Sequence, residues 1–311
     1  MILSIDFGGT RTRAALFKRR DDGLTMVARQ EILSNVAEPQ ADVIARIIAL
    51  AKRVVAVRPL SAIGISAPGP LDPHTGIIYH ARTLPGWQNV PLASNISAAL
   101  GNVPAFMHND ANLAALAEYA RGAAEGCDPV VYLTISTGIG GGLVIGGRLY
   151  SGWSGLAAEP GHQLVALPTG ELVRLEDVAS GTGLGALARS TLQQSDKAST
   201  LREMPLGQVD GRAVGTAAQR GDPFAVSVVE QAGRYLGIGL VNLMHVISPQ
   251  AIVLGGSVSL LGDLLLAPAR AVIDEYILDR RFLPPDLIRP ARLGDDVCLI
   301  GAAYYAQHNS S

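Results

Sequence analysis

Cysteine is scarce in this sequence of 311 residues, which contains only Cys127 and Cys298. Two cysteines so far apart exclude a disulfide framework and a four-thiolate zinc site, and they are typical of a reducing compartment. Charged residues make up only 17% of the chain, and 25 Lys and Arg against 27 Asp and Glu give a net charge of −2. The chain therefore lacks the basic field that attracts nucleic acid, and we expect no nucleic-acid partner.

A long run without charged residues extends from Tyr235 to Gly262. Its length would suffice to cross a bilayer, but Asn242 and Pro249 lie inside it, and Pro249 is expected to divide it into a helix and a strand. The first residues carry no basic leader and reach Asp6 too early for a signal peptide. We therefore expect a cytoplasmic protein with no membrane partner.

Apolar residues predict helices that alternate with strands, the pattern of an α/β protein. Asp222 is the expected N-cap of the clearest helix, with Pro223 in its first turn. Residues 193–212 are polar and are expected to form a surface excursion. Strands are expected at 1–6, 13–17, 62–66, 103–107, 130–135, 143–145, 251–254 and near 288, and helices at 43–57, 111–121, 223–248 and after 296.

Glycine is abundant, with 35 residues, and it is concentrated in two segments between apolar strands. Gly8-Gly9-Thr10 is the first, and residues 137–142 are the second. This recurrence indicates two halves of related architecture. Glycine allows positive φ and lets backbone N–H groups converge on an anion, so both segments are candidate phosphate turns, with plain hairpin turns as the alternative. Asp6 at the end of the first strand would favour hydrated Mg²⁺.

Familiar nucleotide motifs do not explain these turns. The sequence has no G-x-x-x-x-G-K-[ST] motif, which excludes a P-loop. Residues 181–186 match G-x-G-x-x-[GA], but they follow a polar stretch instead of a buried strand. Because dinucleotide binding requires that strand, we do not interpret these residues as a dinucleotide site.

Several polar residues are candidates for acid–base chemistry or for sugar binding. Asp110 follows a predicted strand, and its alternative role is the N-cap of the next helix. Asn109 places an amide beside this carboxylate, a pairing suited to a polyol. Glu159, His162 and Glu176 follow the second glycine-rich segment, and a carboxylate can accept two hydrogen bonds from neighbouring hydroxyls. Taken singly, each of these three residues is more often a solvated surface group.

The order of the motifs resembles the ROK family of sugar kinases and sugar-responsive repressors. This resemblance covers nearly the whole chain and rests on LSIDFGGT, SAPGPLD at 66–72, LPGW at 84–87, HNDAN at 108–112, STGIGGG at 136–142, EPGH at 159–162 and LEDVASGTG at 175–183. It implies an actin-like ATPase (ribonuclease H-like) fold, with two α/β domains around a central cleft. The domains expected are residues 1–108, completed by a C-terminal helix at about 296–311, and residues 109–295.

The resemblance also implies roles for the matching positions. Asp110 resembles the catalytic base, and the expected sugar-binding residues are Gly69, Asn109, Asp110, Glu159, His162 and Glu176. The expected cofactor-binding residues are Asp6, Gly8, Gly9, Thr10, Thr137, Gly138, Gly255 and Gly256, the last two on the adenosine side. The implied reaction is phosphorylation of a hexose by ATP with Mg²⁺, most simply at the 6-hydroxyl of glucose, in a homodimer.

The chain departs from the family pattern in one important place. Kinase members usually carry a C-x-C-G-x-x-G-C zinc cluster between the His and the second Glu, whereas residues 163–175 contain no cysteine. We therefore predict no structural zinc, and a smaller change places Arg11 where many members have Lys. Without zinc, either the sugar site is looser or His162 and Glu176 are fixed by apolar packing of Leu164, Leu167, Leu172 and Val173.

Two other functions remain open at this point. A sugar-responsive transcription regulator would need a DNA-binding domain, for which the expected position of the first turn at Gly8 leaves no room. A sugar-binding protein without kinase activity would fit the missing cluster, but the presence of Asp110 argues against it.

Overall fold

The computed structural model describes residues 1–21, 23–81 and 83–310. Contacts divide the chain into two compact units. The first unit comprises Met1–Gly126, Gly142–Ala158 and Arg292–Ser311, and the second comprises Cys127–Gly141 and Glu159–Ala291. These units are defined by contacts alone, so the domain boundaries expected at 108 and 295 stay a prediction.

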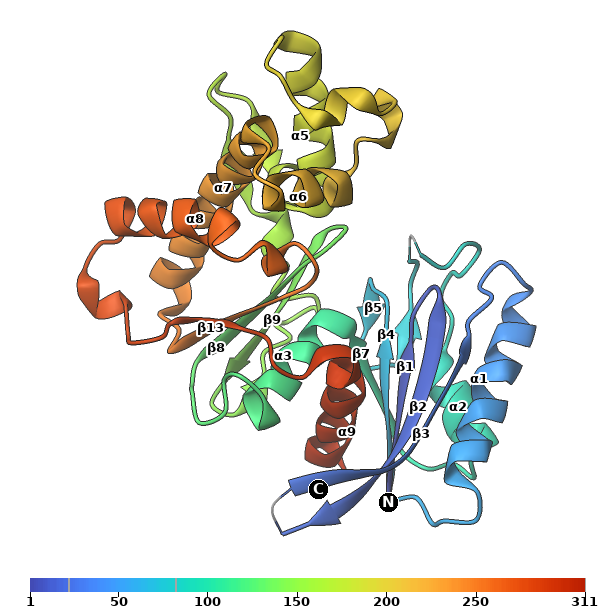
Figure 1. The fold of residues 1–311 in the computed structure, drawn as a ribbon. Helices are drawn as coiled ribbons and strands as arrows, with labels where there is room; N and C mark the ends of the chain where they lie inside the picture. The colour runs from blue at the N-terminus through green and yellow to red at the C-terminus, as the bar shows by residue number, and fades with distance from the viewer. Residues whose placement is uncertain (22, 82, 311) are drawn as a thin grey trace. The chain divides into compact units, whose positions relative to one another are not determined.

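The first unit is built on a mixed five-stranded sheet in the order β3-β2-β1-β4-β7 (Figure 1). Strand β1 pairs antiparallel with β2 and parallel with β4, and β4 pairs parallel with β7. The strands are β1 Ile2–Phe7, β2 Arg11–Arg20, β3 Gly23–Leu33, β4 Ala62–Ala67 and β7 Ala105–Asn109, with a small pair, β5 Leu71–Asp72 and β6 Ile77–Ile78. The helices are α1 Gln40–Val55, α2 Leu92–Ala99, α3 Asp110–Arg121 and α9 Val297–Asn309.

Alternating side chains of β1 serve the two faces of this sheet. Leu3, Ile5 and Phe7 belong to the core that includes α1. Ile2 belongs to the core that includes α3 and α9, and the Ser4 hydroxyl donates to the Leu299 carbonyl of α9 at 2.6 Å. The same alternation places Asp6 on the α9 face of the sheet.

Helix α9 packs with its backbone close to two other elements of the first unit. A Cβ atom at Gly64 of β4 would overlap the Ala302 carbonyl of α9. A Cβ atom at Gly301 of α9 would overlap the Leu113 carbonyl of α3. Glycine is therefore required on both sides of this helix.

The second sheet has the order β10-β9-β8-β13-β14, and the boundary between the units falls within β9. Strand β13 pairs parallel with β8 and with β14. Its strands are β8 Val130–Ile135, β9 Ile139–Ile145, β10 Arg148–Leu149, β13 Ala251–Gly255 and β14 Ile288–Pro290. The two sheets have corresponding strand orders: β3-β2-β1 and β10-β9-β8 each run from the edge inward, followed by two strands from later in the chain. This agrees with the two halves of related architecture that the recurring glycine-rich segments predict.

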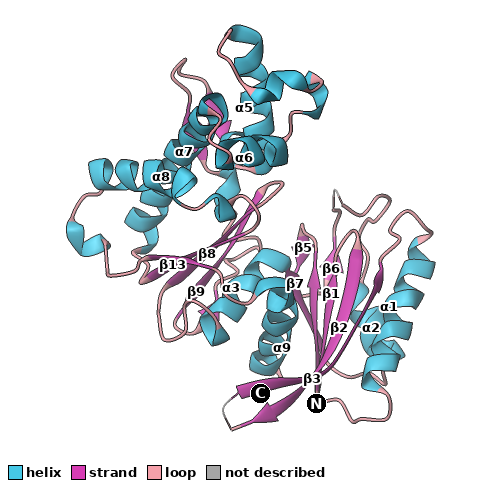
Figure 2. Ribbon diagram, in the orientation of Figure 1, coloured by secondary structure: helices cyan, strands magenta, loops and turns pink. Residues whose placement is uncertain are grey.

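Among the residues described, the second unit also contains a hairpin and five α-helices (Figure 2). These elements are β11 Leu164–Ala166, β12 Leu172–Arg174, α4 Leu175–Ala179, α5 Gly181–Gln194, α6 Gly211–Gln219, α7 Pro223–Ile247 and α8 Asp263–Tyr276. The Asp222 carboxylate accepts from the backbone N–H groups of Phe224 and Ala225, which confirms the expected N-cap of α7.

Some sequence expectations were wrong at element boundaries. Helix α1 begins at Gln40 instead of 43 and ends at Val55, and α3 begins at Asp110 instead of 111. Strand β9 begins at Ile139, so most of the second glycine-rich segment is strand and not turn. No helix among the described residues is long and apolar enough to cross a membrane.

Candidate active site

Polar residues line up at the carboxyl ends of three parallel strands in the first unit. The register places Asp6 of β1 beside Ser66 of β4, and Ser66 beside His108 of β7. Ligands of open α/β sheets bind outside the carboxyl ends of the strands. Asn109 and Asp110 come directly after His108, so this edge of the sheet carries a concentrated group of candidate catalytic residues.

Asn109, and not Asp110, is the N-cap of α3. Its Oδ1 accepts from the backbone N–H and from the side-chain amide of Asn112, both at 2.8 Å. The cap role weighed for Asp110 is therefore filled by its neighbour. Because these bonds engage the Asn109 oxygen, the side chain is oriented to present its NH₂ group as a donor.

His108 fixes the backbone of Asn109 by a hydrogen bond. Its Nδ1 accepts the Asn109 backbone N–H at 2.9 Å, which leaves the proton on Nε2, 2.9 Å from the Ser151 hydroxyl. Burial lowers the pKa of His108 to about 4, so the imidazole is neutral at physiological pH. His108 is thus a fixed support for the strand end.

Asp110 lies at the first position of α3 and is an exposed residue. Its Oδ1 accepts the Ala111 backbone N–H at 2.8 Å, which fixes the orientation of the group. Protein atoms nevertheless crowd this carboxylate, and the resulting desolvation raises its pKa, against the lowering effect of the backbone N–H. The environment therefore makes Asp110 more basic than an ordinary aspartate.

Asp6 is a second perturbed carboxylate at this edge. Burial raises its pKa to about 6, and the nearby charge of Asp110 adds to this, whereas Arg13 lowers it. The Arg13 Nε atom lies 3.7 Å from Asp6 Oδ2. The Cys298 Sγ atom of α9 lies 3.7 Å from the Asp110 carbonyl, and burial raises the pKa of this thiol, so it is not activated as a nucleophile.

Two hydrogen bonds fix the first glycine turn at the end of β1. The Gly8 N–H donates to the Arg11 carbonyl at 3.0 Å, and the Ser34 hydroxyl donates to the Gly8 carbonyl at 2.6 Å. Neither Gly8 nor Gly9 adopts positive φ, so the conformational reason expected for these glycines was wrong. Thr10 is exposed at the tip of the turn.

Gly69 lies against Asn109 in the first unit. A Cβ atom added at Gly69 would lie 3.7 Å from the Asn109 Cβ atom. The structure therefore places Gly69 beside Asn109.

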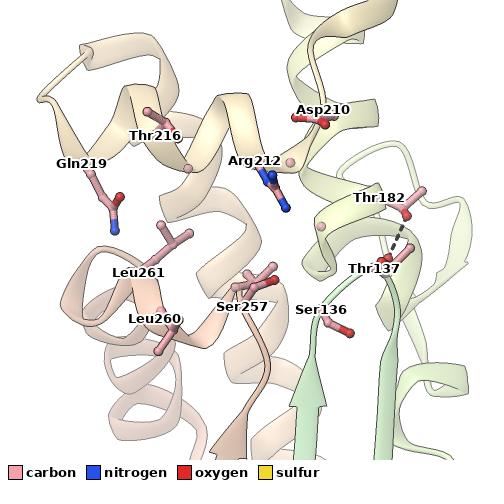
Figure 3. A pocket seen from close by; sticks show the side chains of 14 residues that line it. Ser136, Thr137, Thr182, Asp210, Arg212, Thr216, Gln219, Ser257, Leu260 and Leu261 are labelled. Atoms are coloured by element: carbon pink, nitrogen blue, oxygen red, sulfur yellow. Dashed lines mark hydrogen bonds between the residues drawn. The ribbon is translucent and has the colours of Figure 1, made fainter. Parts of the chain in front are cut away.

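The second unit contains a pocket of about 470 Å³ (Figure 3). Ser136, Thr137 and Thr182 supply hydroxyl groups, Leu260 and Leu261 supply an apolar wall, and Arg212 extends from α6 into the space. This volume lies in the range of small-molecule sites, about 300–1,000 Å³. Its remaining lining residues are Gly181, Asp210, Gly211, Gly215, Thr216, Gln219, Ser257 and Val258.

The turn at one end of this pocket is fixed by the start of α5. The Thr182 hydroxyl donates to the Thr137 carbonyl at 2.7 Å (Figure 3). The Gly181 N–H donates to the Ser136 carbonyl at 2.7 Å. Gly181 and Thr182, which begin the segment 181–186 that the motif analysis set aside, thus do line this pocket. Sequence analysis missed Thr182, because its place depends on the contact between the start of α5 and the turn that follows β8.

Most glycines after this turn are required by packing. A Cβ atom at Gly141 would lie 2.9 Å from the Tyr132 carbonyl, and one at Gly142 would lie 2.8 Å from the Asn112 Cα atom. Gly138 is different, because its Cβ would lie 2.9 Å from Glu176 Oε2. Gly255 and Gly256 are not among the residues that line the pocket, but they immediately precede Ser257 and Val258, which are.

The three candidate sugar ligands of the second unit lie on neighbouring short elements. Glu159 precedes the 3₁₀ turn Pro160–His162 and His162 ends it, and both are exposed. Glu176 is half-buried in α4, and the Leu175 N–H donates to the Gln163 carbonyl at 2.7 Å, which joins the two segments.

The apolar packing expected to fix these ligands was wrong in part. Leu164 and Leu172 are 61% and 62% exposed, and Val165, at 2%, is the buried member of the hairpin. Within the described ranges there is no group of three or more His, Cys, Asp and Glu residues suited to a metal.

Known proteins resemble this chain over nearly its whole length. The ROK family profile matches residues 2–309. The chain belongs to the ROK family. This ROK protein is 32% identical to a glucokinase of Halalkalibacterium halodurans, over 99% of this chain and 96% of the relative.

Solved structures give the same result. A ROK hexokinase from Thermus thermophilus has a TM-score of 0.81 at 35% identity, covering 99% of this chain and 98% of that one. A ROK glucokinase from Streptomyces griseus, in complex with glucose and AMPPNP, has a TM-score of 0.76 at 29% identity, covering 99% of each chain. The ROK protein described here therefore has the actin-like ATPase fold and is a kinase of the hexokinase and glucokinase type.

Proposed function

We propose that this kinase transfers the γ-phosphoryl group of ATP to the 6-hydroxyl of glucose, with Asp110 as the general base. The observation that carries the proposal is the exposed, oriented Asp110 carboxylate, whose pKa is raised by its surroundings. Support for the substrates comes from the Streptomyces griseus relative, which holds glucose and AMPPNP.

Phosphoryl transfer demands positioning and charge neutralisation more than covalent chemistry from the protein. Asp110 would accept a hydrogen bond from the attacking hydroxyl and take its proton as the transfer proceeds. Asn109, with its oxygen engaged by Asn112, would donate from its NH₂ group to a neighbouring sugar oxygen. A positioned general base contributes about 10²–10⁴-fold to the rate.

The pocket of the second unit is suited to a nucleotide. Backbone N–H groups and the Thr137 hydroxyl at its turn would bind phosphate oxygens, and Arg212 would supply positive charge. Leu260 and Leu261 would pack against the base. We propose the same phosphate-binding role for Gly8, Gly9 and Thr10 of the first unit, and a supporting role for Gly255 and Gly256.

Glu159, His162 and Glu176 would bind sugar hydroxyls together with Gly69 and Asn109. Carboxylates accept two hydrogen bonds and can read adjacent hydroxyls. Discrimination between epimeric hexoses rests on a small number of such bonds, because each one lost leaves a polar group without its partner.

Mg²⁺ would be held chiefly by the phosphates and by water, with Asp6 as the protein's contribution. The residues fit this arrangement, since Asp6 offers a carboxylate at the strand end and no multi-carboxylate cage lies in the described part of the chain. Bound Mg²⁺ supplies charge neutralisation on the phosphates.

The decisive experiment replaces Asp110 by Asn and measures ADP release with glucose, ATP and Mg²⁺. We expect kcat to fall by about 10²-fold or more while the KM for glucose changes little, because the amide keeps the shape but cannot take a proton. Asp196→Asn, at an exposed loop position, is the control. Turnover near the wild-type rate in Asp110→Asn would refute the assignment.

A panel of sugars tests the choice of glucose. N-acetylmannosamine, N-acetylglucosamine, fructose and allose are the alternatives, and a higher kcat/KM with any of them would replace glucose as the substrate. The homodimer remains a prediction that sedimentation at several concentrations would test.

A further inference from the structure

Arg174 lies at the end of β12, immediately before α4, and its side chain contacts two consecutive carboxylates. The guanidinium Nε and Nη2 atoms donate to Asp177 at 2.9 and 2.7 Å. The Nη1 atom lies 3.1 Å from Glu176 Oε1. One planar group thus holds both carboxylates at once, which the fork geometry of arginine permits.

Asp177 fixes the arginine through both its backbone and its side chain. Its backbone N–H donates to Asp177 Oδ2 at 3.2 Å, and the Leu175 N–H donates to the Gln163 carbonyl at 2.7 Å. Hydrogen bonds from Arg174 lower the pKa of Asp177, which keeps this carboxylate ionised as the anchor. The guanidinium therefore has one well-defined position relative to α4.

Glu176 is consequently held between a cation and the glycine turn. Its Oε1 faces Arg174, whereas its Oε2 lies where a Cβ atom at Gly138 would come within 2.9 Å. Glu176 is 20% exposed and Arg174 is 47% exposed. So exposed an ion pair contributes little to stability, and its main physical effect is on the orientation of Glu176.

We propose that Arg174 is a positioning residue that sets the affinity for the sugar by holding Glu176 in its binding orientation. This inference rests on the proposed function, in which Glu176 binds sugar hydroxyls. Without Arg174, the adjacent charge of Asp177 repels Glu176, and its long side chain regains rotational freedom.

The test measures kcat and the KM values for glucose and ATP in Arg174→Gln, Arg174→Lys and Glu176→Gln. We expect Arg174→Gln to raise the KM for glucose about tenfold, with kcat and the KM for ATP nearly unchanged. Arg174→Lys should recover only part of the loss, because a point charge cannot hold both carboxylates in the same geometry. Arg281→Gln is the matched control, since Arg281 forms the same two-bond pair with Asp279 at an exposed turn of this unit.

The double variant Arg174→Gln/Glu176→Gln separates positioning from an independent role. If Arg174 acts through Glu176, the double variant has the same KM for glucose as Glu176→Gln alone. The inference would be overturned if the two substitutions multiplied each other's effect on the KM for glucose. It would also be overturned if Arg174→Gln raised the KM for ATP as much as the KM for glucose. An unchanged Arg174→Gln beside an impaired Glu176→Gln would overturn the inference but support the proposed role of Glu176. An unchanged Glu176→Gln would overturn both.

Discussion

Replacing Asp6 by Asn is expected to stabilise the folded protein at pH 8 and to have much less effect at pH 4. Burial raises the pKa of Asp6 from 3.8 to about 6. Between these values the folded protein retains a proton that the unfolded chain has released. Stability is therefore lost as the pH rises through this window, and the loss is complete above the folded pKa.

The magnitude follows from the size of the shift. One pKa unit corresponds to about 1.4 kcal/mol, so ionised Asp6 costs about 3 kcal/mol of unfolding free energy at pH 8. At pH 4 the same linkage gives less than about 1 kcal/mol. Asn carries no charge at either pH, and the stability difference between variant and wild type should therefore change by about 2 kcal/mol between the two conditions.

Urea titrations of both proteins at pH 4 and pH 8 measure this difference. The control Asp196→Asn removes an exposed carboxylate and should give the same difference at both pH values. A pH-independent effect of Asp6→Asn, or greater destabilisation at pH 8 than at pH 4, would refute the reasoning. The expected outcome would mean that the chain retains a destabilising carboxylate at its candidate site. Functional residues often destabilise the fold in this way.

Thr182→Val should raise the KM for ATP about 3- to 10-fold and leave the KM for glucose unchanged, because it removes the hydroxyl that donates to the Thr137 carbonyl. The control is Thr191→Val in the same helix, which loses an equivalent bond to Leu187. Equal KM values for ATP in the two variants would count against the nucleotide pocket. Gly301→Ala should lower the free energy of unfolding by about 3 kcal/mol or more in urea titrations, because the new methyl group overlaps the Leu113 carbonyl. Gly207→Ala should be nearly neutral, because a Cβ atom there meets nothing within 4 Å. Similar urea midpoints for the two variants would contradict the packing argument.

Much of the fold could be predicted because its periodic elements carry strong local signals. The apolar repeat and the Asp222 cap predict α7 in both position and length. Strand β3 was missed because it lies at the sheet edge, where six of its eleven residues are exposed and only one is buried, so that the apolar signal is weak. Helix α5 was missed because it begins with Gly181 and Gly183, which are poor helix formers, and only the Ser180 cap marks its start.

The candidate site could be predicted in part for a similar reason. Residues at strand ends, such as Asp6 and Asp110, are adjacent in sequence to the elements that position them. Arg212 and Thr182 could not be assigned, because their places depend on how α5 meets the turn that follows β8 and on how α6 packs against α5. Arg174 could not be assigned either, because an arginine before a short helix has many possible partners, and only the structure shows that it holds Glu176.

The packing of α9 has a consequence for the order of folding during synthesis. Helix α9 contacts β1 and β4, which are made first, and its Cys298 lies beside Asp110. A nascent chain therefore leaves the face of its first sheet on which α3 and α9 pack only partly covered. Asp6 and Asp110 lack their native surroundings until residues 297–309 have left the ribosome. Catalytic competence in this protein would thus arise only after residues 297–309 have been made, whichever unit acquires its secondary structure first.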